Sequence, residues 1–133
     1  MSWEKDLEIY ADSCMETYTQ ELMSLVKIPS ISAMPEHSKD LYRVLEQMAE
    51  IVQSYGLTPQ VIETPGAPAF LAELQNDPAA PWILVYNHMD VQPADEPQWV
   101  TQPFEPILRD DRVIGRGSTD DKGPALSIIH AIH

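Results

Sequence analysis

Two short motifs in this chain carry side chains that can ligate a metal ion. The first is His88-Met89-Asp90, and the second is Gly117-Ser118-Thr119-Asp120-Asp121-Lys122-Gly123. Imidazole nitrogens and carboxylate oxygens are common zinc ligands, and one carboxylate can offer its two oxygens to two cations. Two such cations about 4 Å apart polarise a carbonyl group and acidify a shared water. Together the motifs therefore indicate part of a metal-dependent hydrolase site.

Each motif taken alone also has a purely structural interpretation. A His-x-Asp sequence is commonly a histidine at the end of a strand followed by an aspartate in a turn. Asp120 or Asp121 can be the N-cap of a following helix, after glycines that permit tight backbone geometry. Lys122 can contact a substrate or a phosphate, although a solvated lysine is the simpler expectation. The metal interpretation therefore depends on both motifs together.

The first motif must be positioned by the apolar run that precedes it. Residues 82–86, Trp-Ile-Leu-Val-Tyr, predict a central strand covered on both faces, as in parallel α/β sheets. Ligands in such sheets bind beyond the carboxyl ends of the strands, which is where His88 follows. Asp90 lies two residues further on, and in an extended chain this places it on the same side as His88. Its carboxylate can then orient the imidazole.

Hydrophobic periodicity predicts three helices. The first spans about residues 4–27 and is stopped by Pro29. The second follows Ser38, a plausible N-cap, and ends at Gly56. A third starts at Pro124, because proline is tolerated in the first turn of a helix.

The remaining segments predict short strands. Residues 60–62 and 70–72 form one pair, while residues 107–108 and 113–114 flank Asp110-Asp111 as a hairpin. The order of helices and strands predicts an α/β fold whose sheet needs further strands. The last helix reaches His133 in mid-pattern, so we expect a truncated domain; the alternative is a small domain whose last helix simply docks.

The amino-acid composition limits which kinds of partner the protein is expected to bind. The chain has 21 Asp and Glu residues against 8 Lys and Arg, a formal charge of −13, which argues against nucleic acid as a partner. No basic amphipathic helix and no apolar run of about 20 residues is present, so no membrane association is expected. The polar N-terminus does not resemble a secretory signal, and Cys14 has no second cysteine to pair with. We therefore expect a cytoplasmic protein.

The two motifs and their surroundings resemble the aminoacylase/carnosinase family of zinc peptidases. The resemblance is carried by Asn87-His88-Met89-Asp90-Val91-Gln92-Pro93, by Trp99, by Pro103-Phe104 and by Gly115-Arg116-Gly117-Ser118-Thr119-Asp120-Asp121-Lys122-Gly123-Pro124. Val26-Lys27-Ile28-Pro29-Ser30-Ile31-Ser32 resembles the N-terminal segment of that family. The Asp-Asp-Lys-Gly-Pro version is most similar to the dipeptidase and carnosinase branch.

This resemblance implies roles for three residues. His88 would ligate one zinc ion, Asp90 would be the catalytic-site carboxylate that orients His88, and Asp120 would bridge both zinc ions. The complete site would hold two Zn²⁺ ions, with Mn²⁺ or Co²⁺ as alternatives. The family often has a non-proline cis peptide after the bridging aspartate, here Asp120–Asp121.

The family's other functional parts have no counterpart in residues 1–133. Its general-base glutamate, its remaining metal ligands and its lid domain, which typically carries dimerisation, would lie downstream. Residues 1–133 would then be the N-terminal part of a single catalytic domain, a partial three-layer α/β/α sandwich without the lid. The expected parent is a dipeptidase acting on a small peptide, or alternatively a deacylase of N-acyl amino acids. The isolated chain is expected to be inactive, at most a fragment with residual metal binding.

Some residues depart from the family pattern or stand outside it. Asp110-Asp111 replaces an expected Asp-Gly at the hairpin turn, where glycine would relieve a positive φ. His37 is predicted to be a loop residue, and His130 and His133 are predicted to belong to the last helix. Trp99 is expected to pack beside the site rather than to contact substrate.

Overall fold

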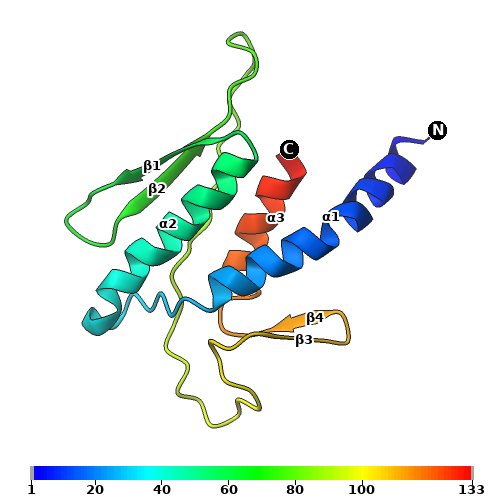
Figure 1. Cartoon of the computed structure of the whole chain (residues 1–133). Helices are drawn as coiled ribbons and strands as arrows, with labels where there is room; N and C mark the ends of the chain where they lie inside the picture. The colour runs from blue at the N-terminus through cyan, green and yellow to red at the C-terminus, as the bar shows by residue number, and fades with distance from the viewer. Residues whose placement is uncertain (1, 133) are drawn as a thin grey trace.

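A computed structural model of the chain describes residues 2–132 and shows a mixed α/β arrangement (Figure 1). Three helices pack together, and two separate antiparallel hairpins lie at their margins. The elements in chain order are α1 (Trp3–Val26), the 3₁₀ turn η1 (Pro35–His37), α2 (Ser38–Ser54), β1 (Thr58–Ile62), β2 (Ala69–Glu73), β3 (Ile107–Arg109), β4 (Arg112–Ile114) and α3 (Lys122–Ile132). His133, expected in the last helix, lies outside the described residues.

Helix α1 confirms the first predicted helix, but only its C-terminal half is buried. Leu22, Leu25 and Val26 lie in the core. Towards the N-terminus, by contrast, Trp3 is 69% exposed and Leu7 is 56% exposed. This half of the helix extends beyond the rest of the molecule (Figure 1). The apolar face of this helix is therefore buried only towards its C-terminus.

Helix α2 contributes five of the twelve core residues, more than any other element. Its apolar stripe, repeating every three to four residues, faces α1, α3 and the β1–β2 hairpin. Gly56 ends the helix as predicted, with a φ of +81° that glycine adopts without strain. Ser38 is the first helical residue and makes no side-chain capping bond, so its predicted N-cap role was wrong. The core contains Leu22, Leu25, Val26, Ile28, Val44, Leu45, Met48, Ile51, Val52, Leu57, Ala125 and Leu126.

Both predicted hairpins are present. Strand β1 pairs antiparallel with β2, and β3 pairs with β4 through the two-residue turn Asp110-Asp111. Asp110 and Asp111 have φ angles of +50° and +57°. Positive φ at both central residues defines the turn that matches strand twist, and glycine is the preferred second residue. The turn therefore keeps the expected geometry with an aspartate in a left-handed conformation.

Replacing Asp111 with glycine should stabilise the protein. Glycine reaches positive φ without the Cβ clash, so we expect the free energy of unfolding to rise by about 0.5–1 kcal/mol, partly offset by the greater entropy of the unfolded chain. Asp111→Ala, which keeps a Cβ and loses the polar side chain, should lower it. Urea unfolding of the two variants checks this, and equal midpoints would contradict the strain argument.

The apolar run at residues 82–86 differs from its prediction. It has no regular secondary structure and is the most exposed apolar segment: Ile83, Leu84 and Tyr86 are 85%, 89% and 87% exposed. A central strand needs neighbours that take up its backbone hydrogen bonds. Within residues 2–132 no strand pairs with this run. The prediction of a central strand was therefore wrong for this structure.

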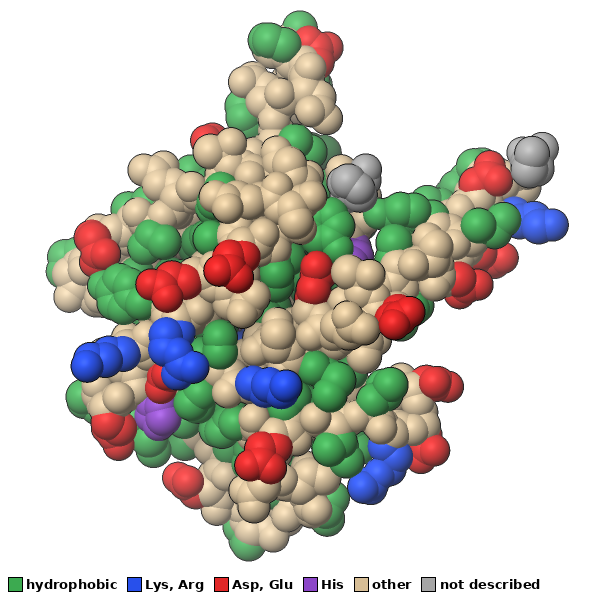
Figure 2. Space-filling model, viewed as in Figure 1, with side chains coloured by type: hydrophobic (Ala, Val, Ile, Leu, Met, Phe, Trp, Pro, Cys, Tyr) green, Lys and Arg blue, Asp and Glu red, His purple; other side chains and the backbone are tan. Residues whose placement is uncertain are grey.

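No helix in the described residues is long and apolar enough to cross a membrane. Acidic side chains are scattered over the face shown in Figure 2 and do not form a single patch there. On this face the excess negative charge is therefore spread over solvated surface.

Candidate metal centre

The structure brings the two motifs together around the His88 ring. His88 Nε2 lies 3.0 Å from Asp120 Oδ1, although the two residues are 32 positions apart in sequence. The other ring nitrogen, Nδ1, lies 3.1 Å from both the carboxylate Oδ1 and the backbone oxygen of Asp90. One nitrogen therefore faces Asp120 and the other faces Asp90.

This donor set fits part of a zinc site. Two ligands at about 2.0 Å from one tetrahedral ion are about 3.3 Å apart, close to the separation of His88 Nε2 and Asp120 Oδ1. Asp120 is accessible, with 85% of its side chain exposed, whereas His88 is 41% exposed. Among residues 2–132, however, no group of three or more His, Cys, Asp or Glu side chains is arranged to hold a metal ion. A complete site therefore needs at least one further ligand.

The surroundings of His88 are strongly acidic. Partial burial of the ring disfavours its charged form. Four interactions favour the charged form and outweigh the effect of burial: the hydrogen bond to the Asp90 backbone, the charges of Asp90 and Asp121, and the hydrogen bond to Asp120. The net result raises the pKa of His88 above its usual value. The same negative charges also attract a metal cation, and a proton on Nε2 would compete with it for the ring.

Asp121 connects the two motifs through its side chain. Its Oδ2 accepts hydrogen bonds from Asn87 Nδ2 at 2.9 Å and from the His88 backbone N–H at 3.2 Å. The Asp120–Asp121 peptide bond is cis, which confirms the expectation from the family resemblance. The contribution of Asp121 was not predicted as more than an alternative helix cap.

Lys122 is a second residue whose role the sequence did not reveal. It is fully buried, and its Nζ donates to the backbone oxygens of Leu25 and Ile28, both at 2.8 Å. Burial lowers the pKa of Lys122 to about 7 against the opposing charges of Asp40 and Asp90. The expectation of a solvated lysine was therefore wrong. The Lys122 side chain links the start of α3 to the C-terminal end of α1 through these two hydrogen bonds.

Glycines allow the second motif to approach its neighbours. Gly117 has a φ of +90°. A Cβ at Gly123 would lie 2.1 Å from the Ser118 backbone oxygen, which no side chain tolerates. The turn before Asp120 is therefore packed directly onto the first turn of α3.

The segment that follows α1 contacts the first motif. Ser30 is fully buried, and its hydroxyl donates to the Met89 backbone oxygen at 2.7 Å. Ile31 forms a parallel bridge with Val91, and Ser32 donates to Asp90 Oδ2 at 2.5 Å. Residues 30–32, here called the connector, therefore lie along the site segment.

Trp99 belongs to a cluster that joins the loop after Asp90 to the turn before Asp120. Its indole N–H donates to Glu96 at 2.9 Å, and the Arg116 guanidinium lies over its ring at 5.3 Å. Arg116 also donates to the Pro93 backbone oxygen and pairs with Glu96. These contacts agree with the expected packing role of Trp99.

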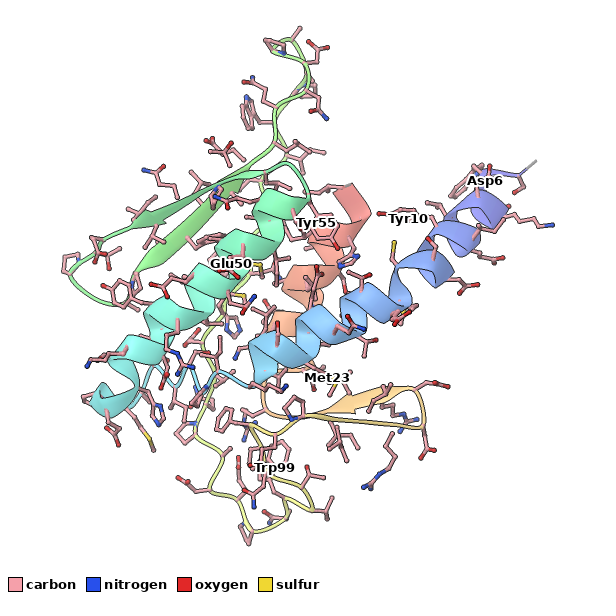
Figure 3. All side chains as sticks on the ribbon, viewed as in Figure 1. Asp6, Tyr10, Met23, Glu50, Tyr55 and Trp99 are labelled. Atoms are coloured by element: carbon pink, nitrogen blue, oxygen red, sulfur yellow. The ribbon has the colours of Figure 1, made fainter. Side chains whose placement is uncertain are left out.

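The other described histidines are engaged elsewhere. His37 lies 2.8 Å from Asp40 at the start of α2. His130 belongs to a polar cluster among the three helices, where its Nε2 lies 2.7 Å from Glu21 and 3.1 Å from the Tyr55 hydroxyl (Figure 3). The Tyr10 hydroxyl donates a hydrogen bond to the backbone oxygen of His130. Neither histidine contributes to the His88 site.

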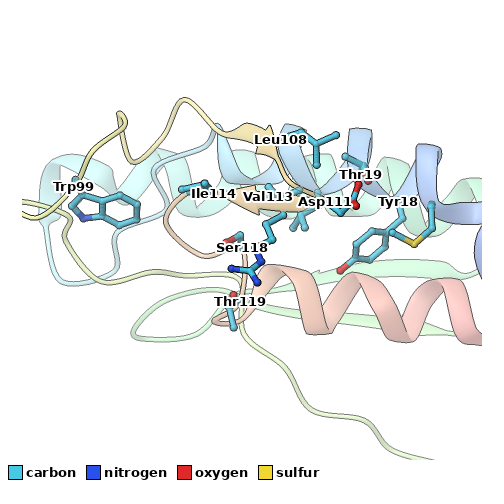
Figure 4. A pocket seen from close by; sticks show the side chains of 13 residues that line it. Tyr18, Thr19, Trp99, Leu108, Asp111, Val113, Ile114, Ser118 and Thr119 are labelled. Atoms are coloured by element: carbon cyan, nitrogen blue, oxygen red, sulfur yellow. The ribbon is translucent and has the colours of Figure 1, made fainter.

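A shallow groove of about 510 Å³ lies between α1 and the β3–β4 hairpin (Figure 4). It is open and mainly apolar, and Ser118 and Thr119, which directly precede Asp120, line one side of it between Trp99 and Tyr18. Its lining comprises Met15, Tyr18, Thr19, Leu22, Trp99, Leu108, Asp111, Arg112, Val113, Ile114, Gly115, Ser118 and Thr119.

Comparison of the sequence with models of known protein families identifies a family that this chain resembles. Residues 84–133, which contain both motifs, match the Peptidase family M20/M25/M40. The resemblance to a peptidase family inferred from the motifs is therefore confirmed.

Several of the similar curated proteins are dipeptidases. The chain is 34% identical to the Beta-Ala-His dipeptidase of Rattus norvegicus, over 92% of this chain and 28% of the relative. It is also 34% identical to the Cys-Gly metallodipeptidase dug1 of Schizosaccharomyces pombe, over 99% of this chain and 30% of the relative. The chain thus spans less than a third of the length of the curated relatives it matches.

Solved structures agree with this similarity. Human carnosine dipeptidase 1 superposes with a TM-score of 0.87 at 31% identity, covering 99% of this chain and 31% of that one. The dipeptidase Dug1p from Saccharomyces cerevisiae superposes with a TM-score of 0.84 at 28% identity, covering 92% and 29%. The predicted α/β fold class and the resemblance to the dipeptidase branch are both confirmed.

Proposed function

We propose that residues 1–133 are the N-terminal part of a single catalytic domain in a binuclear zinc metallopeptidase that cleaves dipeptides. One observation carries the proposal: His88 lies between Asp90 and Asp120, with one ring nitrogen towards each carboxylate. The similarity to dipeptidases over nearly the whole chain supports it.

Three side chains have defined roles in this proposal. His88 presents Nε2 as a ligand, and Asp90 holds the proton on Nδ1 so that Nε2 keeps its lone pair. Asp120 would help to hold both ions, because its carboxylate has two oxygens that can act as ligands. When bound, the two ions supply an acidified water and polarise the scissile carbonyl group.

The residues of this chain prepare that site without completing it. Asp121 and Lys122 fix the loop that carries Asp120, and the connector fixes the segment that carries Asp90. The general base and the additional ligands are supplied by other parts of the complete protein. A catalytic zinc ion has about three protein ligands and a water, so the isolated chain is inactive and at most retains weak metal binding.

The proposed substrate is a small peptide whose amide bond would be hydrolysed. The names of the relatives favour a dipeptide. Deacylation of an N-acyl amino acid is the alternative, since it breaks the same type of bond. Zinc is the proposed metal, with Mn²⁺ or Co²⁺ as substitutes. We further propose a cytoplasmic enzyme that dimerises through a lid domain outside these residues.

Activity assays on two forms of the protein test this function. The full-length protein that contains this segment, loaded with Zn²⁺, should hydrolyse an unblocked dipeptide faster than an N-acetyl amino acid. The 133-residue chain should hydrolyse neither substrate. Loss of activity with a chelator and recovery with zinc should accompany the first result. Zinc-dependent turnover by the pure chain would overturn the incomplete site, and a preference for the acylated substrate would support the deacylase.

A further inference from the structure

We infer that Ser32 is a positioning residue of the metal site, acting through Asp90 on the tautomer and orientation of His88. The effect of Ser32 on metal binding rests on the proposed function, whereas its effect on the His88 tautomer does not. Its structural basis is a relay of three side chains. Ser32 Oγ donates to Asp90 Oδ2 at 2.5 Å, and Asp90 Oδ1 lies 3.1 Å from His88 Nδ1.

The two oxygens of the Asp90 carboxylate have different partners. Oδ2 receives the Ser32 hydroxyl, and Oδ1 faces the imidazole. A carboxylate held at one oxygen cannot rotate freely about its Cβ–Cγ bond, so the second oxygen stays directed at the ring. Asp90 has 39% of its side chain exposed, and packing alone therefore does not hold it.

The connector itself has a fixed register against the site segment. The Ser30 backbone oxygen accepts the Val91 N–H at 2.9 Å, and the buried Ser30 hydroxyl donates to the Met89 backbone oxygen. These bonds lie on either side of Asp90. Ser32 is therefore carried on a segment that cannot slide relative to the carboxylate it contacts.

Two carboxylates compete for the single proton of a neutral His88 ring. Asp120 faces Nε2, and Asp90 faces Nδ1 with both its side-chain and backbone oxygens. A proton on Nδ1 leaves Nε2 free to bind a metal, whereas a proton on Nε2 blocks it. Ser32 keeps the Asp90 carboxylate aligned and so favours the metal-binding tautomer.

The tautomer of His88 in the metal-free chain provides a direct test. At pH 9, two-bond ¹H–¹⁵N correlation spectra report which ring nitrogen carries the proton. We expect the Nδ1–H form to dominate in the wild type and to fall to about half of the population in Ser32→Ala. Ser32→Thr keeps the hydroxyl, and its extra methyl group projects from an exposed position, so it should retain the wild-type ratio.

A remote serine gives the matched control. Ser54 Oγ bonds the Ile51 backbone oxygen at the end of α2, so Ser54→Ala removes a comparable hydroxyl away from the site and should leave the tautomer ratio unchanged. An unchanged ratio in Ser32→Ala, or a ratio that falls equally in Ser32→Thr, would overturn the inference. Circular dichroism confirms that each variant is folded.

Zinc affinity separates this inference from the proposed function. Titration of the chain with Zn²⁺ alone should show roughly 3- to 10-fold weaker binding for Ser32→Ala, less than the 10- to 100-fold typical of a group that directly supports a ligand. If His88→Ala leaves zinc binding unchanged, the proposed function fails while the tautomer result still decides the role of Ser32. If His88→Ala loses binding and Ser32→Ala does not change the tautomer, only the positioning role fails.

Discussion

Replacing His88 with alanine should weaken zinc binding by the chain more than tenfold. His88 Nε2 and Asp120 Oδ1 are the two donors whose separation fits one ion, so losing either leaves a single exposed ligand. Groups that only support a ligand already change affinity 10- to 100-fold, and a direct ligand should matter at least as much. Competition with a chromogenic zinc chelator at constant pH measures the effect, and Asp120→Ala should produce a similar loss.

His37 offers a matched control for this experiment. It forms another close histidine–carboxylate pair, with Asp40 at 2.8 Å, but at the start of α2 rather than in the candidate centre. His37→Ala should therefore bind zinc as the wild type does. Equal affinities for His88→Ala and His37→Ala would show that the bound zinc is not held by the two motifs.

Replacing Lys122 with alanine should lower the free energy of unfolding by about 2–4 kcal/mol. The substitution removes three buried methylenes, Cγ to Cε, at about 0.8 kcal/mol for each. It also removes the two hydrogen bonds that the ammonium donates to the Leu25 and Ile28 carbonyls. Each carbonyl keeps a backbone N–H donor, from Ile28 and Ser30 respectively, so the loss is that of the hydrogen bonds themselves, about 1 kcal/mol each. Relief of the unfavourable burial of the ammonium group offsets part of this loss.

Two further variants separate these contributions. Lys122→Met keeps a stem of similar length and loses only the amine, so its unfolding midpoint in urea should fall between those of the wild type and Lys122→Ala. Lys39→Ala removes an exposed lysine from α2 and should change stability by less than about 0.5 kcal/mol. If Lys122→Ala and Lys39→Ala unfold at the same urea concentration, the buried contacts do not stabilise the chain.

The sequence predicted features that depend on local pattern. The apolar stripe of α2, the stop at Gly56 and the hairpin turn at Asp110-Asp111 each follow from periodicity or turn chemistry, and the structure contains all three. The closeness of the two motifs followed from the family resemblance rather than from periodicity. The structure adds the geometry, with His88 placed between Asp90 and Asp120.

Features that depend on distant partners were not predictable. Lys122 can be buried because it donates to the carbonyls of Ile28 and Leu25 at the C-terminal end of α1, 94 and 97 residues earlier in the chain. The sequence around Lys122 contains no pattern that predicts these partners. The contact of Ser32 with Asp90 likewise spans 58 residues. The run at residues 82–86 has the composition of a central strand, but composition does not supply the neighbouring strands that such a strand needs.

The separation of Lys122 from its carbonyl partners also has a consequence for the order of folding. Helix α2 and the β1–β2 hairpin can form as soon as residues 38–73 are available, because their contacts are close in sequence. Helix α1 can already pack on α2, but its contacts with α3 must wait for residues 122–132. The contacts that fix the loop of Asp120 instead close chain segments of more than 90 residues, which carries a larger entropy cost. During synthesis the metal centre should therefore take shape only after the scaffold of α1 and α2 exists, so a ribosome-bound chain ending before Lys122 would carry an assembled scaffold without a centre.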